Sequence, residues 1–191
     1  GENIMANKDA AFGLRAIGKV GQNRDNQGLS EYDIAASATA IYQNDPVEMA
    51  ATGTITVAAA TDTLLGSLNG VFFTDANTSK PTYANHLNAS NTATDIVGFV
   101  SDDPYERFEV QSDGATAAAD VGMNADIVYA AGSSPDYVSK VELDFSDQKT
   151  ATAQLRVLAI SNDIENNEAG SANVNLVVMI NEHFLKGTVG V

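Results

Sequence analysis

Residues 13–20 have the glycine and lysine spacing of a phosphate-binding loop, G-x-x-x-x-G-K. In such a loop the next residue is Ser or Thr, because its hydroxyl binds the Mg²⁺ that accompanies the nucleotide. Here that position is Val20, and no apolar strand precedes Gly13. We therefore interpret the spacing as a chance feature of a glycine-rich segment and expect no nucleotide site.

Histidine chemistry is restricted to His86 and His183, which lie far apart in the sequence. The run Gly66-Ser67-Leu68-Asn69-Gly70 does not have the G-x-S-x-G spacing of a serine nucleophile. Two isolated histidines are more often structural or solvated than catalytic. The sequence thus predicts no catalytic residue, and we expect that the protein is not an enzyme.

Acidic residues gather at Asp163, Glu165 and Glu168, but the order of an EF-hand fails because Glu168 stands where glycine is required. Asp102-Asp103-Pro104 is typical of a turn that links two strands. The chain of 191 residues contains no cysteine, which excludes thiolate metal sites and disulfides. We expect no cofactor and no metal site within the chain. A cation held between subunits stays open as an alternative to a solvated acidic surface.

Positive charge is concentrated at the N-terminus. Residues 1–24 hold four of the ten basic residues and carry a net charge of +2. Residues 25–191 carry a net charge of −17, which gives the total of −15. This glycine-rich segment is weakly hydrophobic, so we interpret residues 1–30 as an extended arm that lies on another, acidic surface. The side chains expected to make this contact are Lys8, Phe12, Leu14, Arg15, Ile17, Lys19 and Arg24.

After residue 30, short apolar runs are separated by Gly, Pro, Asn and Asp, and no helical stripe is present. This pattern predicts an all-β domain over residues 31–191, a β-barrel or a compact β-sandwich, with a long surface loop at about 74–94. The expected strands cover residues 34–42, 47–50, 54–58, 64–73, 95–101, 105–112, 125–130, 141–145, 152–161 and 173–180.

Three residues of the 105–112 run are candidates for a subunit contact: Tyr105, Arg107 and Phe108. Aromatic residues and arginine are enriched at the centres of interfaces. The alternative is that Phe108 belongs to the core and that Arg107 is a solvated partner of Glu109.

Several classes of partner are disfavoured by composition. No run of 18 apolar residues exists, so we expect no membrane-spanning segment. A sequence pI near 4.2 argues against nucleic-acid binding. Arg15 and Lys19 interrupt what would be the apolar part of a signal peptide, so we expect none.

Short motifs along the chain suggest a family. They are Asn44-Asp45-Pro46-Val47, Leu64-Leu65-Gly66, Asp95-Ile96-Val97-Gly98-Phe99-Val100 and Gly122-Met123-Asn124-Ala125-Asp126. On these motifs the chain resembles virion structural proteins of tailed bacteriophages, especially marine ones, and most of all the capsid decoration (cement) proteins.

The resemblance implies a virion protein that is made in the bacterial cytoplasm and binds the outer surface of the shell of major capsid protein. It implies no catalytic residue, a homotrimer as the most plausible oligomer, and stabilisation of the shell by bridging neighbouring capsomers. In this interpretation the N-terminal arm is the capsid-contacting element. A head fibre or tail protein, and a secreted glycan- or calcium-binding β-module, stay open as alternatives.

Overall fold

The computed structural model describes residues 6–21, 28–146, 148 and 150–187. Within these residues the chain forms thirteen strands and two short 3₁₀ helices, Ala118–Asp120 (η1) and Phe184–Lys186 (η2), and no α-helix. The all-β class predicted from the sequence is confirmed. The described part also contains no helix that is long and apolar enough to cross a membrane.

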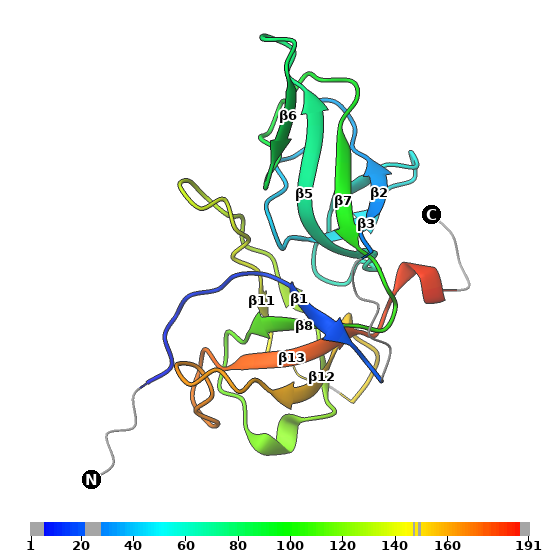
Figure 1. Ribbon diagram of the computed structural model, residues 1–191. Helices are drawn as coiled ribbons and strands as arrows, with labels where there is room; N and C mark the ends of the chain where they lie inside the picture. Colours follow the sequence, from blue (N-terminus) through cyan, green and yellow to red (C-terminus); the bar gives the residue numbers. More distant parts are fainter. Residues whose placement is uncertain (1–5, 22–27, 147, 149, 188–191) are drawn as a thin grey trace.

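One lobe, the lower one in Figure 1, is built on a five-stranded antiparallel sheet in the order β1-β8-β13-β12-β9. Apolar residues on alternate positions, such as Leu176, Val178 and Ile180, are fully buried, as expected for strands with one face on a core. A two-stranded sheet, β10-β11, completes this lobe. The strand bounds are Arg15–Lys19 (β1), Glu106–Gln111 (β8), Asn124–Ala125 (β9), Ile127–Val128 (β10), Glu142–Leu143 (β11), Leu155–Ile160 (β12) and Asn175–Ile180 (β13).

The other lobe holds a six-stranded antiparallel sheet in the order β2-β7-β5-β3-β4, with β6 also paired to β5. The β5 strand pairs with β3 at Gly66 and Ser67 and with β6 over residues 71–74. Because β7 occupies the opposite edge of β5, β3 and β6 share one edge at its two ends. The strand bounds are Ser30–Asp33 (β2), Pro46–Met49 (β3), Ile55–Val57 (β4), Gly66–Thr74 (β5), Pro81–Ala84 (β6) and Val97–Ser101 (β7).

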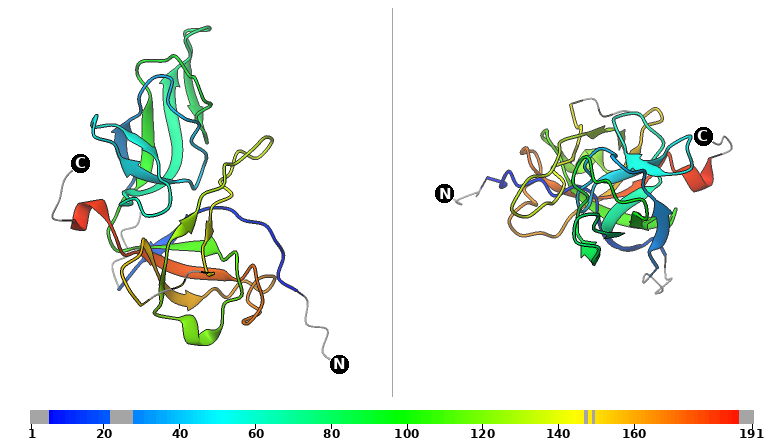
Figure 2. Two further views of the ribbon diagram at one scale, coloured as in Figure 1. Left: turned by 180° about the vertical axis from the view of Figure 1, so that it is seen from behind. Right: turned by 90° about the horizontal axis from the view of Figure 1, so that it is seen from above.

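The six-stranded lobe is inserted between two neighbouring strands of the five-stranded sheet. The β1 strand pairs with β8, with Arg15 opposite Glu109 and Lys19 opposite Glu106, and strands β2 to β7 lie between them in the chain. Figure 2 shows the two lobes from behind, with the N-terminal segment running along the lobe that also contains the C-terminal half. The N-terminal segment is therefore part of a sheet built from distant parts of the sequence.

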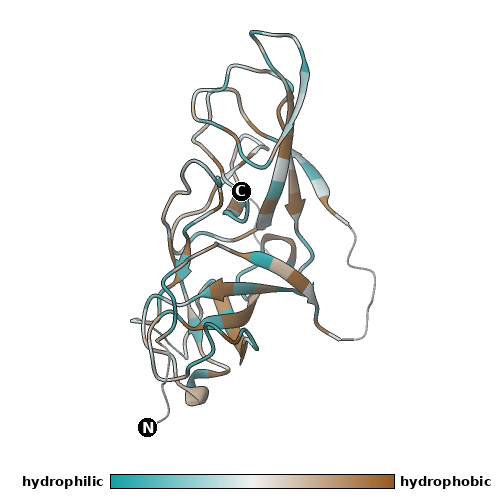
Figure 3. Cartoon of the chain, turned by 60° about the vertical axis from the view of Figure 1, so that its left-hand side comes forward, coloured by the Kyte–Doolittle hydropathy of each residue, from teal (hydrophilic) through white to brown (hydrophobic). Residues whose placement is uncertain are grey.

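The architecture is sandwich-like. The sequence also allowed a β-barrel, but the described residues do not form a closed barrel. Two hydrophobic clusters occupy the two lobes: Phe108 and Leu155 belong to one, Ile41 and Leu68 to the other. Figure 3 shows hydrophobic residues concentrated in the strands of both lobes. The body expected as one barrel or sandwich therefore has two cores, and Ala58 and Leu64 of the inserted segment contribute to the core of the five-stranded lobe.

The segment before β1 joins the two lobes through hydrogen bonds. The Leu14 N–H donates to the Asn44 carbonyl at 2.8 Å, and the Asn44 side-chain amide donates to the Phe12 carbonyl at 3.0 Å. The Ser67 hydroxyl donates to the Leu14 carbonyl at 2.5 Å. Gly13 has φ +72°, and a Cβ atom there would lie 2.4 Å from the Asn44 carbonyl oxygen. This glycine is thus required for close approach of two backbones rather than for phosphate binding.

Two further joints fix the lobes together. In the first, the Gln43 N–H donates to the Tyr137 carbonyl at 3.2 Å, and the Ser139 N–H donates to the Gln43 carbonyl at 2.8 Å. In the second, the Phe184 N–H donates to the Leu64 carbonyl at 2.8 Å. The loop that carries Tyr137 reaches from the five-stranded lobe to the other lobe in Figure 1. The three joints thus come from three separate segments of the chain.

Two segments of the six-stranded lobe differ from the sequence-based expectation. The predicted surface loop at 74–94 contains β6, and Leu87 within it is fully buried and exchanges backbone hydrogen bonds with Ile41. Conversely, residues 34–42 were expected to form a strand but contribute only the isolated bridge at Ile41.

Residues 6–21 and 28–30, the described parts of the predicted arm at 1–30, belong to the body of the protein, and Ser30 begins β2. Asn7 is buried, and its side-chain amide donates to the carbonyls of Glu168 and Ala172 at 3.1 and 2.8 Å. Leu14 is fully buried in the core of the five-stranded lobe. The segment is therefore not the free tether that the sequence led us to expect, because it supplies an edge strand to the sheet and a side chain, Leu14, to the core.

We predict that Leu14→Ala lowers the free energy of unfolding by about 2–5 kcal/mol, the usual cost of truncating a fully buried leucine. Ile17→Ala, three residues along the same segment, removes a side chain that is 43% exposed and should cost less than about 1 kcal/mol. Urea unfolding followed by circular dichroism measures both values. Equal small effects would show that the N-terminal segment does not contribute to the folded core.

Candidate functional site

Basic residues of the N-terminal segment pair with acidic residues of the same chain. Arg15 forms an ion pair with Glu109, and its guanidinium carbon lies 4.6 Å from the centre of the Phe12 ring. Lys19 forms an ion pair with Asp103, with 2.7 Å between Nζ and Oδ2. The acidic partners of Arg15 and Lys19 thus lie within the same chain, on β8 and in the turn before it, and the expected contact with another surface stays a prediction.

The other residues predicted to contact a partner differ in their accessibility. Lys8 is exposed, Phe12 is half-buried, and Ile17 is 43% exposed. Leu14 is fully buried and is unavailable to a partner in this conformation. Arg24 lies outside the described residues. Of the described residues of this set, Lys8 and Ile17 offer exposed side chains that form no ion pair or ring contact with the described part of the chain.

A buried carboxylate fixes the irregular middle of β1. The register of the β1–β8 pairing shifts between Ala16 and Gly18, and Glu106 accepts a hydrogen bond from the Gly18 N–H at 3.1 Å. Burial raises the pKa of Glu106, and the nearby Lys19 acts in the opposite direction. A hydrogen bond from Lys19 lowers the pKa of Asp103. Lys19 thus lies between two carboxylates that it helps to keep ionised.

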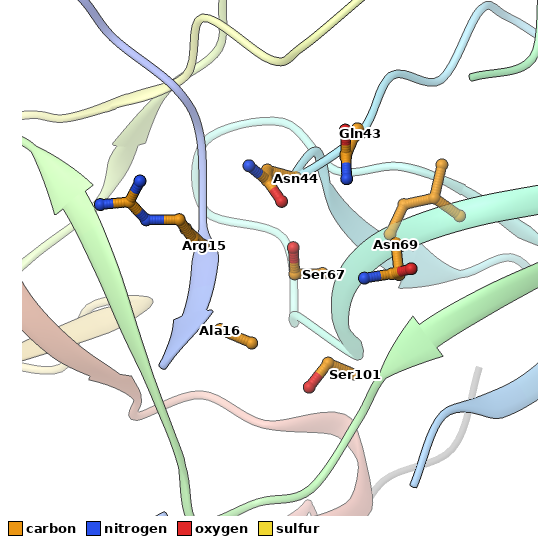
Figure 4. Close-up of a pocket in the computed structure, with 8 residues that line it drawn as sticks. Arg15, Ala16, Gln43, Asn44, Ser67, Asn69 and Ser101 are labelled. Atoms are coloured by element: carbon orange, nitrogen blue, oxygen red, sulfur yellow. The ribbon is translucent and has the colours of Figure 1, made fainter. Parts of the chain in front are cut away.

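A groove between the lobes runs beside β1. It consists of two adjoining pockets of ≈ 220 and ≈ 310 Å³ that share Ala16, Asn69 and Ser101. Figure 4 shows that the side chains around the first pocket end mostly in amide and hydroxyl groups. Such a lining can donate and accept hydrogen bonds. The Ser67 hydroxyl in it already donates to the backbone of the N-terminal segment.

Exposed aliphatic side chains border this groove. Ile17, Val20 and Leu29 are each 43% exposed, and Ile17 and Leu29 line the larger pocket. The β1 strand is the terminal strand of its sheet, so one of its edges pairs with no strand of the described chain. An edge strand flanked by exposed apolar side chains is a template for pairing with another chain.

The three residues predicted at a subunit contact do not form one surface. Phe108 is fully buried in the core of the five-stranded lobe, as the alternative interpretation expected. Tyr105 is 58% exposed, and Lys186 Nζ lies 4.4 Å from the centre of its ring. Arg107 is half-buried, and Glu109, its expected partner, pairs instead with Arg15. Only Tyr105 presents a large exposed surface.

The acidic residues of the last loop serve local structure in the described chain. Asp163 accepts hydrogen bonds from the Asn175 side-chain amide at 2.9 Å and from the Glu165 N–H at 3.1 Å. No group of three His, Asp or Glu side chains placed to hold a metal ion is found among the described residues.

The two histidines lie in different surroundings. His183 is buried, its Nδ1 accepts a hydrogen bond from the Leu185 N–H at 3.1 Å, and burial lowers its pKa to about 4. His86 stacks on Tyr137 with 3.8 Å between the ring centres and 3° between the ring planes. His183 therefore acts as a helix cap, and the His86–Tyr137 stack reinforces the contact between the lobes.

Sequence reasoning missed an aromatic cluster on the six-stranded lobe. The rings of Phe72 and Tyr83 have centres 4.8 Å apart, and those of Tyr83 and Phe99 are 6.2 Å apart. Phe72 and Phe99 lie in expected strands, but Tyr83 fell in the expected loop at 74–94. The β-prone run 81–84 was the available signal, because a strand there would pair back onto β5.

A buried carboxyl group lies under the junction of the lobes. Asp45 is fully buried and accepts a hydrogen bond from the Tyr42 N–H at 2.8 Å. Burial raises the pKa of Asp45 to about 6, and hydrogen bonds from Ser139 and Tyr42 act in the opposite direction. An unfolded aspartate titrates near pH ~3.9, so the folded state holds the proton more tightly.

Asp45 should therefore make stability depend on pH. A raised folded pKa contributes stability that is full below pH ~3.9 and is lost as the pH rises through about 6. Relative to Asp45→Asn, the wild-type free energy of unfolding should fall by about 2 kcal/mol between pH 4.5 and pH 7.5. Urea unfolding of both proteins at the two pH values measures this change. A difference between the proteins that does not vary with pH would contradict the assignment.

Comparison with known proteins adds no relative: no protein-family model, curated protein or solved structure matches the chain.

Proposed function

We propose that this chain is a capsid decoration protein of a tailed bacteriophage. In this proposal it binds the outer surface of the shell formed by the major capsid protein and bridges neighbouring capsomers. It acts as a homotrimer on the virion, has no catalytic role, and uses no cofactor. The proposal combines the sequence resemblance with a surface suited to assembly.

The observation that carries the proposal is the free edge of β1. Ile17, Val20 and Leu29 expose aliphatic surface beside an edge strand, and Arg15 and Lys19 on the same strand are held by ion pairs to the body. A chain of the shell can add to such an edge through main-chain hydrogen bonds, with side-chain pockets giving specificity. Within the N-terminal segment, the free edge of β1 is therefore the part that would pair with a chain of the shell.

The construction of the body also suits a bridging role. Hydrogen bonds at three joints hold the two lobes together. A rigid body binds with less loss of conformational freedom than one whose parts must first be ordered. The net charge of −15 keeps free copies soluble and apart until they dock.

Stabilisation of the shell would follow from mass action. A protein that binds only the assembled state shifts the equilibrium toward that state. A trimer that contacts several capsomers at once gains further from its effective local concentration. Many weak contacts at sheet edges are therefore sufficient for firm attachment.

The first test is the copy number in purified virions of the phage that encodes the chain, measured by quantitative mass spectrometry. A decoration protein should be present in a fixed, high ratio to the major capsid protein. Absence from virions, or the low ratio of a tail component, would contradict the proposal.

The second test is rebinding of purified protein to shells from which it has been stripped. Ile17→Asp places a charge at the exposed edge of β1 and should abolish or strongly weaken co-sedimentation with shells. Ile164→Asp makes the same change at a residue that is 90% exposed on the loop between β12 and β13, and should bind as wild type. If Ile164→Asp releases the protein and Ile17→Asp does not, β1 is not the docking edge.

A further inference from the structure

Three aromatic rings form a row on one face of the six-stranded sheet. Phe72 on β5 is paired with Tyr83 on β6, and Phe99 on β7 is paired with Gly70 on β5. The ring of Tyr83 is tilted by 48° to that of Phe72 and lies at 19° to that of Phe99. Tyr83 is 76% exposed, so its ring projects from the sheet rather than lying within it.

A shallow, open hollow of ≈ 380 Å³ lies beside this row, and Tyr83, Phe99 and Gly70 line it. Gly70 occupies the position between the aromatic strands where a side chain would otherwise fill the space. A Cβ atom at Gly70 would lie 3.0 Å from the Ala84 carbonyl oxygen. The glycine therefore allows close approach of β5 and β6 and leaves the shallow surface beside Tyr83 and Phe99 uncovered.

Amide side chains complete the lining of the hollow. Asn69 is exposed at the irregularity where the β5–β7 register shifts between Leu68 and Gly70. Such bulges commonly redirect a side chain at a functional site. The Asn69 side chain makes no hydrogen bond within the described part of the chain, so both its donor and acceptor atoms are available.

Two further amides lie beside Asn69. Asn85 is held by hydrogen bonds from its side-chain amide to the Asp136 carbonyl at 3.0 Å and to Gln43 Oε1 at 3.4 Å. This arrangement orients Gln43, whose own amide group has no hydrogen-bond partner among the described residues and can donate. The hollow thus combines aromatic faces with carboxamides, of which Asn85 is held in place by hydrogen bonds.

We propose that this hollow is a binding site for a neutral oligosaccharide. A pyranose ring has an apolar C–H face that packs on an aromatic ring and a rim of hydroxyls that hydrogen-bond to carboxamides. Tyr83 and Phe99 supply the aromatic faces, and Asn69 and Gln43 supply the amides. Among the described residues no Lys or Arg lines the hollow, and the chain carries a net charge of −15, so an anionic saccharide is disfavoured.

The size and composition of the site favour a saccharide over a protein partner. The two rings that line the hollow, Tyr83 and Phe99, offer only a small apolar area, whereas the core of a protein interface is larger and more apolar. The aromatic rings lie on the six-stranded sheet, whereas the proposed shell contact is at β1 of the other sheet, although Asn69 lines both this hollow and the groove beside β1. The inference therefore goes beyond the proposed function and does not depend on it.

The test uses four neutral oligosaccharides as probes: maltotetraose, cellotetraose, mannotriose and chitotriose. Saturation-transfer difference NMR on the full chain identifies binding, and isothermal titration calorimetry measures affinity. At least one probe should bind at millimolar concentrations. Tyr83→Ala should raise its Kd about tenfold, the equivalent of losing one aromatic stacking contact.

Two further variants locate the site. Asn69→Ala should also weaken binding, because it removes an available amide without truncating an aromatic ring. Tyr105→Ala, a matched change at a 58% exposed tyrosine on the other lobe, should leave the Kd unchanged. Unfolding curves of the variants check that each is folded, which is expected because Tyr83 and Asn69 are exposed.

Failure of all four probes to bind wild-type protein would overturn the inference. Binding that Tyr83→Ala leaves intact would also overturn it, because the saccharide would then occupy another site. If sedimentation shows that Tyr83→Ala disrupts an oligomer and no probe binds wild type, the rings form a subunit interface instead. Each of these results leaves the proposed shell contact at β1 unaffected.

Discussion

The pairing of β1 with β8 is the constraint on which the rest of the structure depends. This pairing makes β1 the edge strand of the five-stranded sheet, beside a strand that is far from it in the sequence. The six-stranded lobe lies between β1 and β8 in the chain, so it must leave the five-stranded sheet and return to it at one place. The pairing also buries Leu14 and presents the Leu14 backbone to Asn44 and Ser67 of the other lobe. Orientation of the lobes, the groove between them and the free sheet edge all follow from this pairing.

Charge is organised around the same strand. Arg15 and Lys19 offset the carboxylates of Glu109 and Asp103, which would otherwise be desolvated without a counter-charge near the sheet. Partly exposed pairs of this kind contribute modestly to stability, but they hold the strand in register on β8. With its cations engaged in this way, β1 offers a partner mainly its backbone edge and the side chain of Ile17.

Local patterns in the sequence were sufficient to predict the all-β class and several strands. The expected run at 105–112 contains β8, and those at 152–161 and 173–180 contain β12 and β13. Non-local pairings were not predictable in this way. β1 contains Gly18 and shows little alternation of apolar and polar residues, so its strand character depends on β8, a distant segment. Tyr83 joins Phe72 and Phe99 only through the β5–β6 and β5–β7 pairings, so the aromatic hollow could not be found from spacing alone.

Hydrogen exchange of the isolated protein, followed by mass spectrometry, tests the central role of β1 most directly. If β1 is an integral strand, the amides of peptides covering residues 14–20 should be protected to a similar degree as those of β8. Protection reports the free energy of local opening, so it separates an integral strand from a segment that is merely attached. Complete exchange of residues 14–20 at the earliest time, with β8 still protected, would show that the N-terminal segment is a free tether and would contradict this account.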